Sequence, residues 1–376
     1  MKQGFHDRLF DDATRVKLDI FRRYAREWIS VVLTRSNRQF KQLNIYDFFA
    51  GPGQDKAGNP GSPVIVLEEV KAFCRGRKTL KADIPVRMVF NDKNDEHIAT
   101  LKQNVSQVRC SESCCCFEYS ALPFADALPK YLRQMGEPGQ ANLVLMDQFG
   151  IKEITPEVVR ALLGCRSTDI LFFISSSFIR RFIETPEFQV HFKLDPSVLK
   201  NVEYSAIHRY ICDHYRSALG KLVALVAPFS IRKGVNIYGV IFATRHRLGM
   251  EKFLKVCWAM DPSTGEANYN IDNDPAWNGE RFLYPDMNTI TKIELFEQSL
   301  MNYIQEMTPT NVELYGFCLE KGFCASKANE TLRKLQRSCE ITVTEITTGT
   351  VARKGSFYLA DDNKRVIFGV KDHASN

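Results

Sequence analysis

The sequence predicts an α/β protein with a mostly parallel sheet, followed by a smaller, mainly helical unit. Three observations support this class. Short apolar stretches alternate with longer amphipathic ones between residues 43 and 175, as strands and helices do in βαβ units. Two apolar runs that can pair as an antiparallel hairpin come next. Beyond a stretch rich in Asn, Asp, Pro and Gly, three further helical patterns precede a second hairpin.

The first element is one amphipathic helix over residues 13–39, because apolar residues recur there close to every 3.6 positions. Its other face is basic, and we interpret it as a solvated surface in preference to a phosphate-facing one; it carries Arg15, Lys17, Arg22, Arg23 and Arg26. Strands are then expected over residues 43–49, 86–91, 115–119, 143–147 and 170–175, and helices over residues 63–74, 96–108, 125–135 and 156–163.

Residues 178–216 predict further helix, with an extended interruption around Pro196. The runs 221–227 and 236–244 predict the strands of the first hairpin, joined by a loop over residues 228–234. A parallel sheet that finishes in an antiparallel hairpin is the layout of the Rossmann-like class I methyltransferase fold. We therefore expect that fold for this part of the chain.

The C-terminal region predicts a different unit. Three helices, over residues 290–307, 312–320 and 326–337, are followed by strands over residues 341–346 and around 356–359. Three helices and a β-hairpin are in the order of a winged helix. The predicted organisation is a methyltransferase-like domain over residues 1–260, a linker over residues 261–289 and a winged-helix domain over residues 290–376.

The composition is that of a globular protein, with 44% hydrophobic and 25% charged residues. The chain has no run of eighteen apolar residues, and its first residues lack the order of a secretory signal, so the cytoplasm is the expected location. The net charge of +6 is compatible with a polyanionic partner without requiring one.

The strongest functional signal is the turn Asp47-Phe48-Phe49-Ala50-Gly51-Pro52-Gly53, which closes the first predicted strand. Its two glycines allow the backbone to approach a ligand closely. The spacing is neither the dinucleotide pattern GxGxxG nor a P-loop. We expect Phe49, Ala50, Gly51 and Gly53 to bind a cofactor, and Asp47 to bind the charged amino-acid end of S-adenosylmethionine. Glycine turns after strands are common, so this motif alone is weak.

Three further strand ends carry matching residues. Asp92 follows the second strand, where an acidic residue accepts hydrogen bonds from ribose hydroxyls or caps the next helix. Leu122 lies in the third loop, where an adenine ring would be held. Asp147 and Gln148 end the fourth strand, and Asp147 is expected either to bind a substrate amine while Phe149 stacks on a base, or to cap a helix. Their order and placement together favour a cofactor and substrate site.

These residues resemble the three-Cys-motif partner (TcmP) family over much of residues 10–260. The likeness is carried by Thr14-Arg15-Val16-Lys17 with Tyr24 and Trp28, by Tyr46 and the turn that follows it, by Gly61-Ser62-Pro63, by Asp147-Gln148-Phe149-Gly150 and by Tyr238-Gly239-Val240-Ile241-Phe242-Ala243-Thr244. The resemblance implies a Rossmann-like methyltransferase fold. It also implies a partner protein that carries a three-cysteine motif and an iron–sulfur or radical site.

The cysteine run Cys114-Cys115-Cys116 of this chain is not that motif, because neighbouring side chains of a strand face opposite ways. A zinc site that includes Cys110 is disfavoured, and we expect no metal.

One departure from the family concerns Gln148, which stands where the family motif reads Asp-Pro-Phe-Gly. Proline would fix the backbone so that its carbonyl and the Asp side chain both face a target amine. Glutamine loosens that constraint and adds its own donor and acceptor. The leading hypothesis is a methyltransferase acting on an exocyclic amine of a nucleic-acid base. The alternative is a non-catalytic binding partner that recruits a neighbouring protein to nucleic acid, in phage defence or DNA repair.

The predicted winged helix supplies candidate phosphate contacts, which position a protein on nucleic acid without specifying sequence. They are Lys327, Arg333, Lys334 and Arg337 on the last helix, with Arg353 and Lys354 at the tip of the wing. The alternative is that this unit binds another protein.

Overall fold

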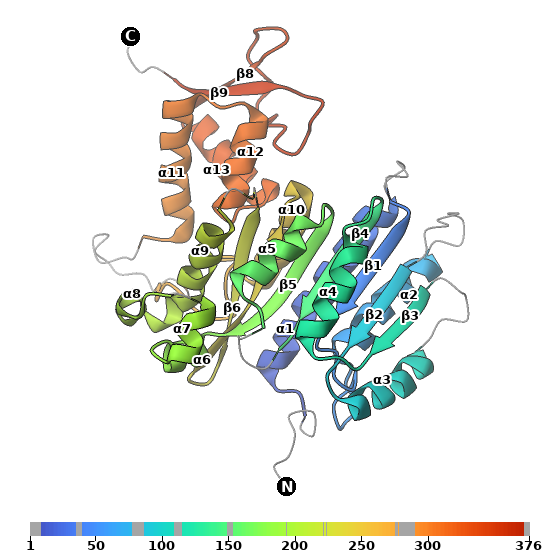
Figure 1. Ribbon diagram of the computed structural model, residues 1–376. Coiled ribbons are helices and arrows are strands. Elements are labelled where there is room, and N and C mark those ends of the chain that lie inside the picture. The colour runs from blue at the N-terminus through green and yellow to red at the C-terminus, as the bar shows by residue number, and fades with distance from the viewer. Residues whose placement is uncertain are drawn as a thin grey trace. The chain divides into compact units, whose positions relative to one another are not determined.

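The computed structural model describes residues 9–34, 40–76, 86–108, 115–148, 153–192, 194–220, 222, 224–274, 277 and 290–371. They form two compact units, both drawn in Figure 1. The first unit comprises Met1–Cys257 with Glu266–Tyr269, and the second comprises Trp258–Gly265 with Asn270–Asn376.

A seven-stranded sheet forms the centre of the described part of the first unit, in the order β3-β2-β1-β4-β5-β7-β6. The five strands from β3 to β5 are parallel, and β7 runs antiparallel to both β5 and β6. This arrangement confirms the predicted mixed α/β class with a mostly parallel sheet. The strands are β1 (Gln42–Asp47), β2 (Val86–Asn91), β3 (Cys115–Ser120), β4 (Gln140–Met146), β5 (Thr168–Ser175), β6 (Leu225–Lys233) and β7 (Asn236–Thr244).

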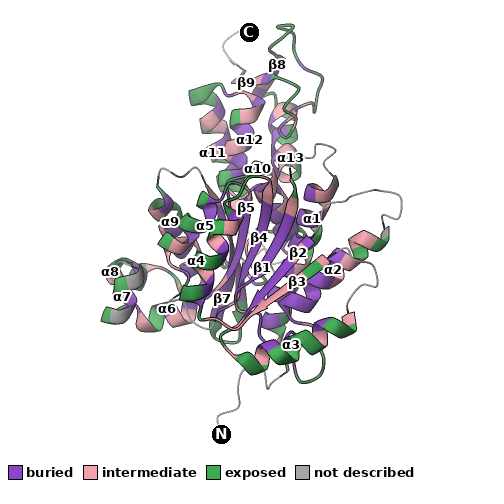
Figure 2. Ribbon diagram, turned by 45° about the vertical axis from the view of Figure 1, so that its right-hand side comes forward, coloured by how far each residue is buried: buried purple, intermediate pink, exposed green. Residues whose placement is uncertain are grey.

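Helices cover both faces of this sheet, and Figure 2 shows the central strands buried between them. One face packs against α4, α5 and α9 in a single apolar cluster, while α1 packs on α2 behind the other face. The helices are α1 (Asp12–Thr34), α2 (Ser62–Gly76), α3 (Asp95–Val108), α4 (Phe124–Met135), α5 (Pro156–Gly164), α6 (Ser176–Phe182), α7 (Pro186–Phe192), α8 (Pro196–Asn201), α9 (Ile207–Leu219) and α10 (Arg247–Met260).

The predicted hairpin loop over residues 228–234 is wrong, because β6 continues through most of it and the turn lies at Gly234, where φ is +54°. Pro228 is paired opposite Ile241 within the strand. A proline is tolerated there because β6 is the edge strand, so its missing N–H leaves no ladder bond broken. The sequence analysis also missed α10.

Part of the predicted linker is packed. Ser230 N–H of β6 donates to Glu266 O at 2.6 Å, and Ala267 is buried. The extents of the predicted domains stay a prediction.

The basic face predicted for the first helix is largely paired with acids. Arg22 bonds Glu68 and Glu69 of α2, and Arg26 bonds Glu69. Lys17 is buried. The solvated interpretation is therefore wrong for Lys17, whereas the side chain of Arg26 remains 63% exposed beside its acidic partner.

A buried polar cluster joins α1 to the sheet. Tyr24 Oη of α1 donates to Asp169 Oδ2 of β5 at 2.7 Å, and Thr244 Oγ1 of β7 donates to the other carboxylate oxygen. Burial raises the pKa of Asp169. The Tyr24 ring also lies 4.6 Å from the Phe242 ring, centroid to centroid, so α1 is attached by both packing and hydrogen bonds.

The second unit contains three helices and a two-stranded antiparallel sheet among its described residues. They are α11 (Lys292–Met307), α12 (Asn311–Glu320), α13 (Ala325–Arg337), β8 (Ile341–Glu345) and β9 (Val366–Val370). Capping boxes at Thr291 and Thr310 begin α11 and α12.

The strand predicted around residues 356–359 is wrong, since β9 begins at Val366. Phe357 and Leu359 are buried, but their backbone is not in a strand. Alternating apolar residues indicate which side chains face a core. Here those side chains are buried, but the backbone that carries them pairs with no strand. No helix in the described ranges is both long and apolar enough to cross a membrane.

The cluster around Asp169 predicts a difference between two buried tyrosines. Tyr24→Phe removes a donor from a buried carboxylate and should lower the free energy of unfolding by about 1–3 kcal/mol. Tyr46→Phe removes a buried hydroxyl that has no hydrogen bond to any described residue, so it should be neutral or stabilising. Urea unfolding of the two variants measures both values, and equal losses would contradict the role of the Tyr24–Asp169 bond.

Candidate active site

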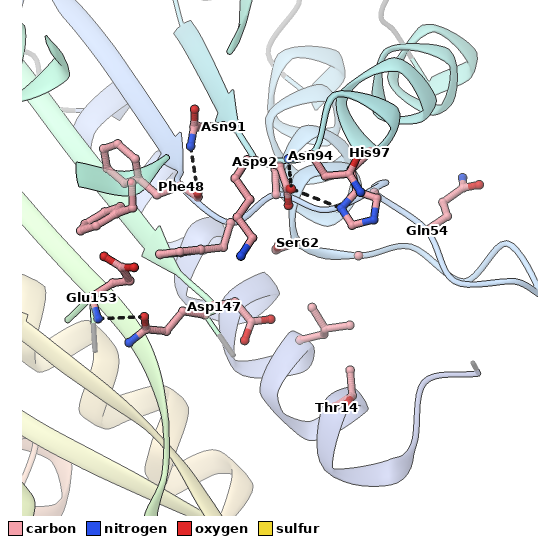
Figure 3. Close-up of a pocket in the computed structure, with 18 of the residues that line it drawn as sticks. Thr14, Phe48, Gln54, Ser62, Asn91, Asp92, Asn94, His97, Asp147 and Glu153 are labelled. Atoms are coloured by element: carbon pink, nitrogen blue, oxygen red, sulfur yellow. Dashed lines mark hydrogen bonds and ion pairs between the residues drawn. The ribbon is translucent and has the colours of Figure 1, made fainter. Parts of the chain in front are cut away.

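The C-terminal ends of the parallel strands surround a cavity of about 460 Å³, shown in Figure 3. Such an edge is where ligands bind in open α/β sheets. Most of the residues predicted to bind a cofactor or substrate line it, namely Phe49, Ala50, Gly53, Asp92, Leu122, Asp147 and Gln148. Asp47 and Gly51 are not among its lining residues, and Phe149 lies outside the described residues.

The glycine turn after β1 has a backbone that favours glycine at two positions. Gly51 has φ of +57° and Gly53 has φ of +81°. A Cβ at Gly53 would also lie 2.5 Å from Leu101 Cδ1 of α3. Gly61 N–H donates to Gly53 O at 2.8 Å, so the third segment of the family resemblance, Gly61-Ser62-Pro63, closes the turn onto the start of α2.

Asp47 lies behind the cavity wall and holds this turn in place. It is 1% exposed; Oδ2 accepts from Ser62 Oγ at 2.6 Å and Oδ1 accepts from Phe49 N–H at 3.2 Å. Burial raises the pKa of Asp47 to about 7 against these hydrogen bonds, and the negative charges of Asp147 and Asp92 raise it further. The sequence analysis expected Asp47 to contact a cofactor, whereas the structure gives it two partners within the protein.

Asp92 after β2 also braces the turn. Its Oδ2 accepts from Gly51 N–H at 3.0 Å, and its Oδ1 accepts from Asn94 N–H at 2.9 Å and lies 3.2 Å from His97 Nδ1. Figure 3 shows Asp92, Asn94 and His97 together at one end of the cavity. Asp92 lines the cavity with part of its carboxylate still open to a ligand.

The loop after β3 forms an apolar part of the cavity wall. Phe49 and Phe124 stack with ring centroids 5.2 Å apart, and Leu122 lines the cavity beside them. Asn91 at the end of β2 fixes this loop, because its Oδ1 accepts from Leu122 N–H at 3.2 Å and its Nδ2 donates to Leu122 O at 3.0 Å. The apolar surface and the position fit the predicted place for an adenine ring.

Asp147 after β4 forms an ion pair with Lys17 of α1 through Oδ2. Lys17 is 4% exposed, and its ammonium also lies 4.6 Å from the centroid of the Phe173 ring. Oδ1 of Asp147 makes no hydrogen bond with a described residue. One oxygen of this carboxylate is therefore held by the protein, and the other faces the site.

Gln148 is 5% exposed and its amide has a defined orientation. Its Oε1 accepts from Glu153 N–H at 3.2 Å, a bond drawn in Figure 3. Its Nε2 has no hydrogen-bond partner among the described residues.

The contribution of α1 to the cavity was missed by the sequence analysis. Thr14, Lys17 and Leu18 of α1 line it, and so does Phe10, which precedes the helix and whose N–H donates to Asp55 Oδ2 at 2.9 Å. The spacing of Thr14, Lys17 and Leu18 on one helical face was the available signal. Within the described ranges, no group of three His, Cys, Asp or Glu side chains is arranged to hold a metal ion.

The second unit gathers some of the predicted phosphate contacts. Lys327 pairs with Glu330 at 3.1 Å and Lys334 pairs with Glu297 at 2.7 Å, whereas Arg333 and Arg337 have no ion pair with a described residue. Gly355 N–H donates to Gln336 Oε1 at 2.8 Å. This bond brings the turn that carries Arg353 and Lys354 against α13, although that turn lies outside any strand.

The raised pKa of Asp47 predicts a pH-dependent difference from Asp47→Asn. The pKa of Asp47 is about 7 in the folded protein and 3.8 in the unfolded chain. The contribution of protonated Asp47 to the free energy of unfolding is therefore complete below pH 3.8 and is lost as the pH rises through 7. The variant should therefore gain on the wild type between these values, by on the order of 4 kcal/mol at most. Urea unfolding at several pH values measures the difference, and parallel profiles would contradict it.

The chain matches no known protein-family model, and no curated protein matches it. Solved structures do. A SAM-dependent methyltransferase from Agrobacterium tumefaciens matches with 10% identity and a TM-score of 0.34, over 59% of this chain and 61% of that one. Trm1 from Pyrococcus horikoshii, in complex with S-adenosyl-L-methionine, matches with 11% identity and a TM-score of 0.37, over 65% of this chain and 59% of that one.

Magnesium protoporphyrin IX methyltransferase from Synechocystis PCC 6803, with bound SAH, matches with 10% identity and a TM-score of 0.34, over 64% of this chain and 90% of that one. The chain thus spans about three fifths of the first two proteins.

Proposed function

We propose that the first unit is an S-adenosylmethionine-dependent methyltransferase that acts on an exocyclic amine of a nucleic-acid base. The observation that carries the proposal is the cavity at the C-terminal edge of a sheet with the class I strand order. Around it lie a glycine turn after β1, an acid after β2, an apolar wall after β3 and an acid after β4.

The chemistry of these residues fits the cofactor. The stacked pair Phe49 and Phe124, with Leu122, offers an apolar surface for adenine, and Asp92 offers acceptor oxygens for ribose hydroxyls. Asp147 and Asp92 each raise the pKa of Asp47 by charge repulsion. Three acids, Asp92, Asp147 and Glu153, line the cavity together with two lysines, Lys17 and Lys93. This balance of charge is compatible with a ligand that carries a sulfonium and an ammonium group.

Asp147 is the residue we assign to the methyl acceptor. When bound, S-adenosylmethionine would supply a methyl group on a sulfonium; the amine nitrogen takes this methyl, the sulfur is left as a thioether, and one N–H proton is released. Asp147 Oδ1 would accept a hydrogen bond from the amine, orient it and receive or pass on that proton. Lys17 holds the other oxygen, which keeps the carboxylate in place. A base inside a duplex must leave the stack to reach Asp147.

For the second unit we propose a winged helix that contacts phosphates. Its three helices and two-stranded sheet support this assignment. Of the four basic residues predicted on α13, Arg333 and Arg337 have no ion pair with a described residue, and α13 lies beside the turn with Arg353 and Lys354. These four residues carry the proposal more than Lys327 and Lys334, whose charges are already matched.

A second candidate function is a non-catalytic scaffold that recruits a partner protein, such as one with a three-cysteine motif, to nucleic acid. Gln148 in place of proline favours it. It differs from the first proposal in requiring no methyl transfer.

The glycine turn provides the test of cofactor binding. Calorimetry should detect S-adenosylmethionine binding to the wild type, and Gly53→Ala should weaken it at least tenfold, because the added Cβ would displace Leu101 and the turn. Gly58→Ala is the matched control: Gly58 has φ of +80°, close to that of Gly53, but nothing lies within 4 Å of an added Cβ. Absence of binding to the wild type at high micromolar cofactor would refute the methyltransferase proposal.

Salt dependence tests the second unit. The double variant Arg333→Ala/Arg337→Ala should bind DNA and RNA more weakly, and the slope of log K against log salt should fall by roughly one for each phosphate that the protein no longer neutralises. Lys334→Ala should change the slope less, because Lys334 is paired with Glu297. Fluorescence anisotropy titrations at salt concentrations from about 50 to about 200 mM measure both slopes, because binding through phosphate contacts weakens over this range. Equal slopes in all three proteins would exclude these arginines as phosphate-binding residues.

A further inference from the structure

We propose that Arg180, Arg181 and Arg232 form a phosphate-binding surface on the first unit, which holds the backbone of a nucleic-acid strand while one of its bases enters the cavity. We call these three residues, with Tyr204 and Tyr269, the arginine surface. Its choice of partner rests on the proposed function. It differs from the phosphate contacts proposed for the second unit, because it belongs to the unit that carries the cavity.

The three arginines are exposed cations that stack on aromatic rings. Arg180 Cζ lies 5.3 Å from the centroid of the Tyr204 ring. Arg232 Cζ lies 4.0 Å from the centroid of the Tyr269 ring, and Arg181 Cζ lies 5.3 Å from the ring of the residue that follows it. None of the three guanidinium groups has an ion pair or a hydrogen bond with a described residue. Stacking holds a planar guanidinium by its face and leaves the N–H groups at its edge for an anion.

The two arginine–tyrosine pairs are joined into one surface by hydrogen bonds beneath them. Ser177 Oγ of α6 bonds to Tyr204 Oη and accepts from Ile237 N–H at 2.9 Å. Ile237 of β7 lies opposite Arg232 of β6 in the sheet. Tyr269 Oη donates at 2.7 Å to the carbonyl of the residue that follows Tyr204. The arginines from α6 and from β6 are therefore held side by side.

The acidic residues near this surface leave its positive charge largely unmatched. Glu266 accepts from Arg209 Nε at 2.8 Å, and Glu184 pairs with Lys200, so both of these acids are matched by other cations. Glu203 is exposed and has no ion pair with a described residue, so it offsets one of the three charges. The surface therefore remains positively charged and complements an anionic partner.

The arginine surface lies at the edge of the sheet that carries the cavity. β4 leads into Asp147, and β5 lies between β4 and β7. Ser175 ends β5 opposite Tyr238 near the start of β7. Because β7 is antiparallel to β5 and to β6, its start and the end of β6 with Arg232 are at the edge where β4 and β5 end. α6 begins directly after β5, and Figure 1 shows it at the lower end of the sheet.

The distance along this edge suits a nucleic-acid strand. Neighbouring strands of a sheet are about 4.8 Å apart, so β6 is about 14 Å from β4. That distance equals about four nucleotides at the rise of roughly 3.4 Å per nucleotide in one stacked strand. A strand with one base at Asp147 therefore brings phosphates close to the arginine surface. Arginine forms bidentate hydrogen bonds with phosphate oxygens, and such contacts position a strand without reading its sequence.

Oligonucleotide binding by the full chain tests the arginine surface. The double variant Arg180→Ala/Arg232→Ala should bind a fluorescent single strand of about twelve nucleotides, a length within the usual range of single-strand sites, roughly tenfold more weakly than the wild type. The slope of log K against log salt should fall by about 1.4, because each neutralised phosphate of a single strand contributes about 0.7. Arg180→Lys/Arg232→Lys keeps both charges and should retain the slope, while it loses the stacked, forked group.

Arg133→Ala is the matched control. Arg133 is exposed, has no ion pair with a described residue and lies in the last turn of α4. Phe124 at the start of that helix lines the cavity, so Arg133 lies at the end of α4 that is away from the site. This variant should keep the affinity and the slope of the wild type. If the alanine double variant does not fold, as judged by its thermal midpoint, Arg181→Ala alone should lower the slope by about 0.7.

A folded double variant with the slope and the affinity of the wild type would overturn the proposal. A labelled polyglutamate peptide separates nucleic acid from an acidic protein segment as the partner. If the double variant lost polyglutamate binding and kept oligonucleotide binding, nucleic acid would be the wrong occupant.

Calorimetry with S-adenosylmethionine separates this inference from the proposed function. The arginine surface does not line the cavity, so the double variant should bind the cofactor as the wild type does. Absence of cofactor binding to the wild type overturns the methyltransferase proposal, whereas the salt slopes decide the arginine surface independently of it.

Discussion

The candidate site depends on the hydrogen bonds of one buried carboxylate, Asp47. It joins the end of β1 to the first turn of α2 through Ser62, and it holds the glycine turn through Phe49 N–H. This glycine turn places Gly53 against Gly61 and against Leu101 of α3. Burial raises the pKa of Asp47 to about 7, and the nearby charges of Asp147 and Asp92 raise it further. Ionising Asp47 in the folded protein is therefore unfavourable, and a cationic ligand is proposed to bind beside it.

Helix α1 completes the cavity from outside the sheet. Two sets of bonds attach it: arginines of α1 pair with Glu69 of α2, and Tyr24 bonds to Asp169 at the start of β5. With the helix held at both places, Lys17 reaches Asp147 at the end of β4. The ammonium of Lys17, which the sequence alone assigns to a solvated face, is thereby buried and holds one oxygen of Asp147.

The end of β4 combines an acceptor and a donor in two consecutive residues. Lys17 and Glu153 N–H fix one end of each side chain, so that Asp147 Oδ1 and Gln148 Nε2 are left without partners among the described residues. The protein thus holds one oxygen of Asp147 through Lys17 and the amide oxygen of Gln148 through Glu153 N–H.

The pattern of amino acids was enough to order the strands and helices and to locate the glycine turn, because hydrophobic periodicity and glycine act over a few residues. The cavity residues at the strand ends followed from that order, since parallel strands bring their C-terminal ends to one edge. The folded chain was needed to show that Lys17 pairs with Asp147, that Pro228 lies inside an edge strand and that β9 begins at Val366. These features depend on which distant segment supplies a partner, and no local pattern contains that information.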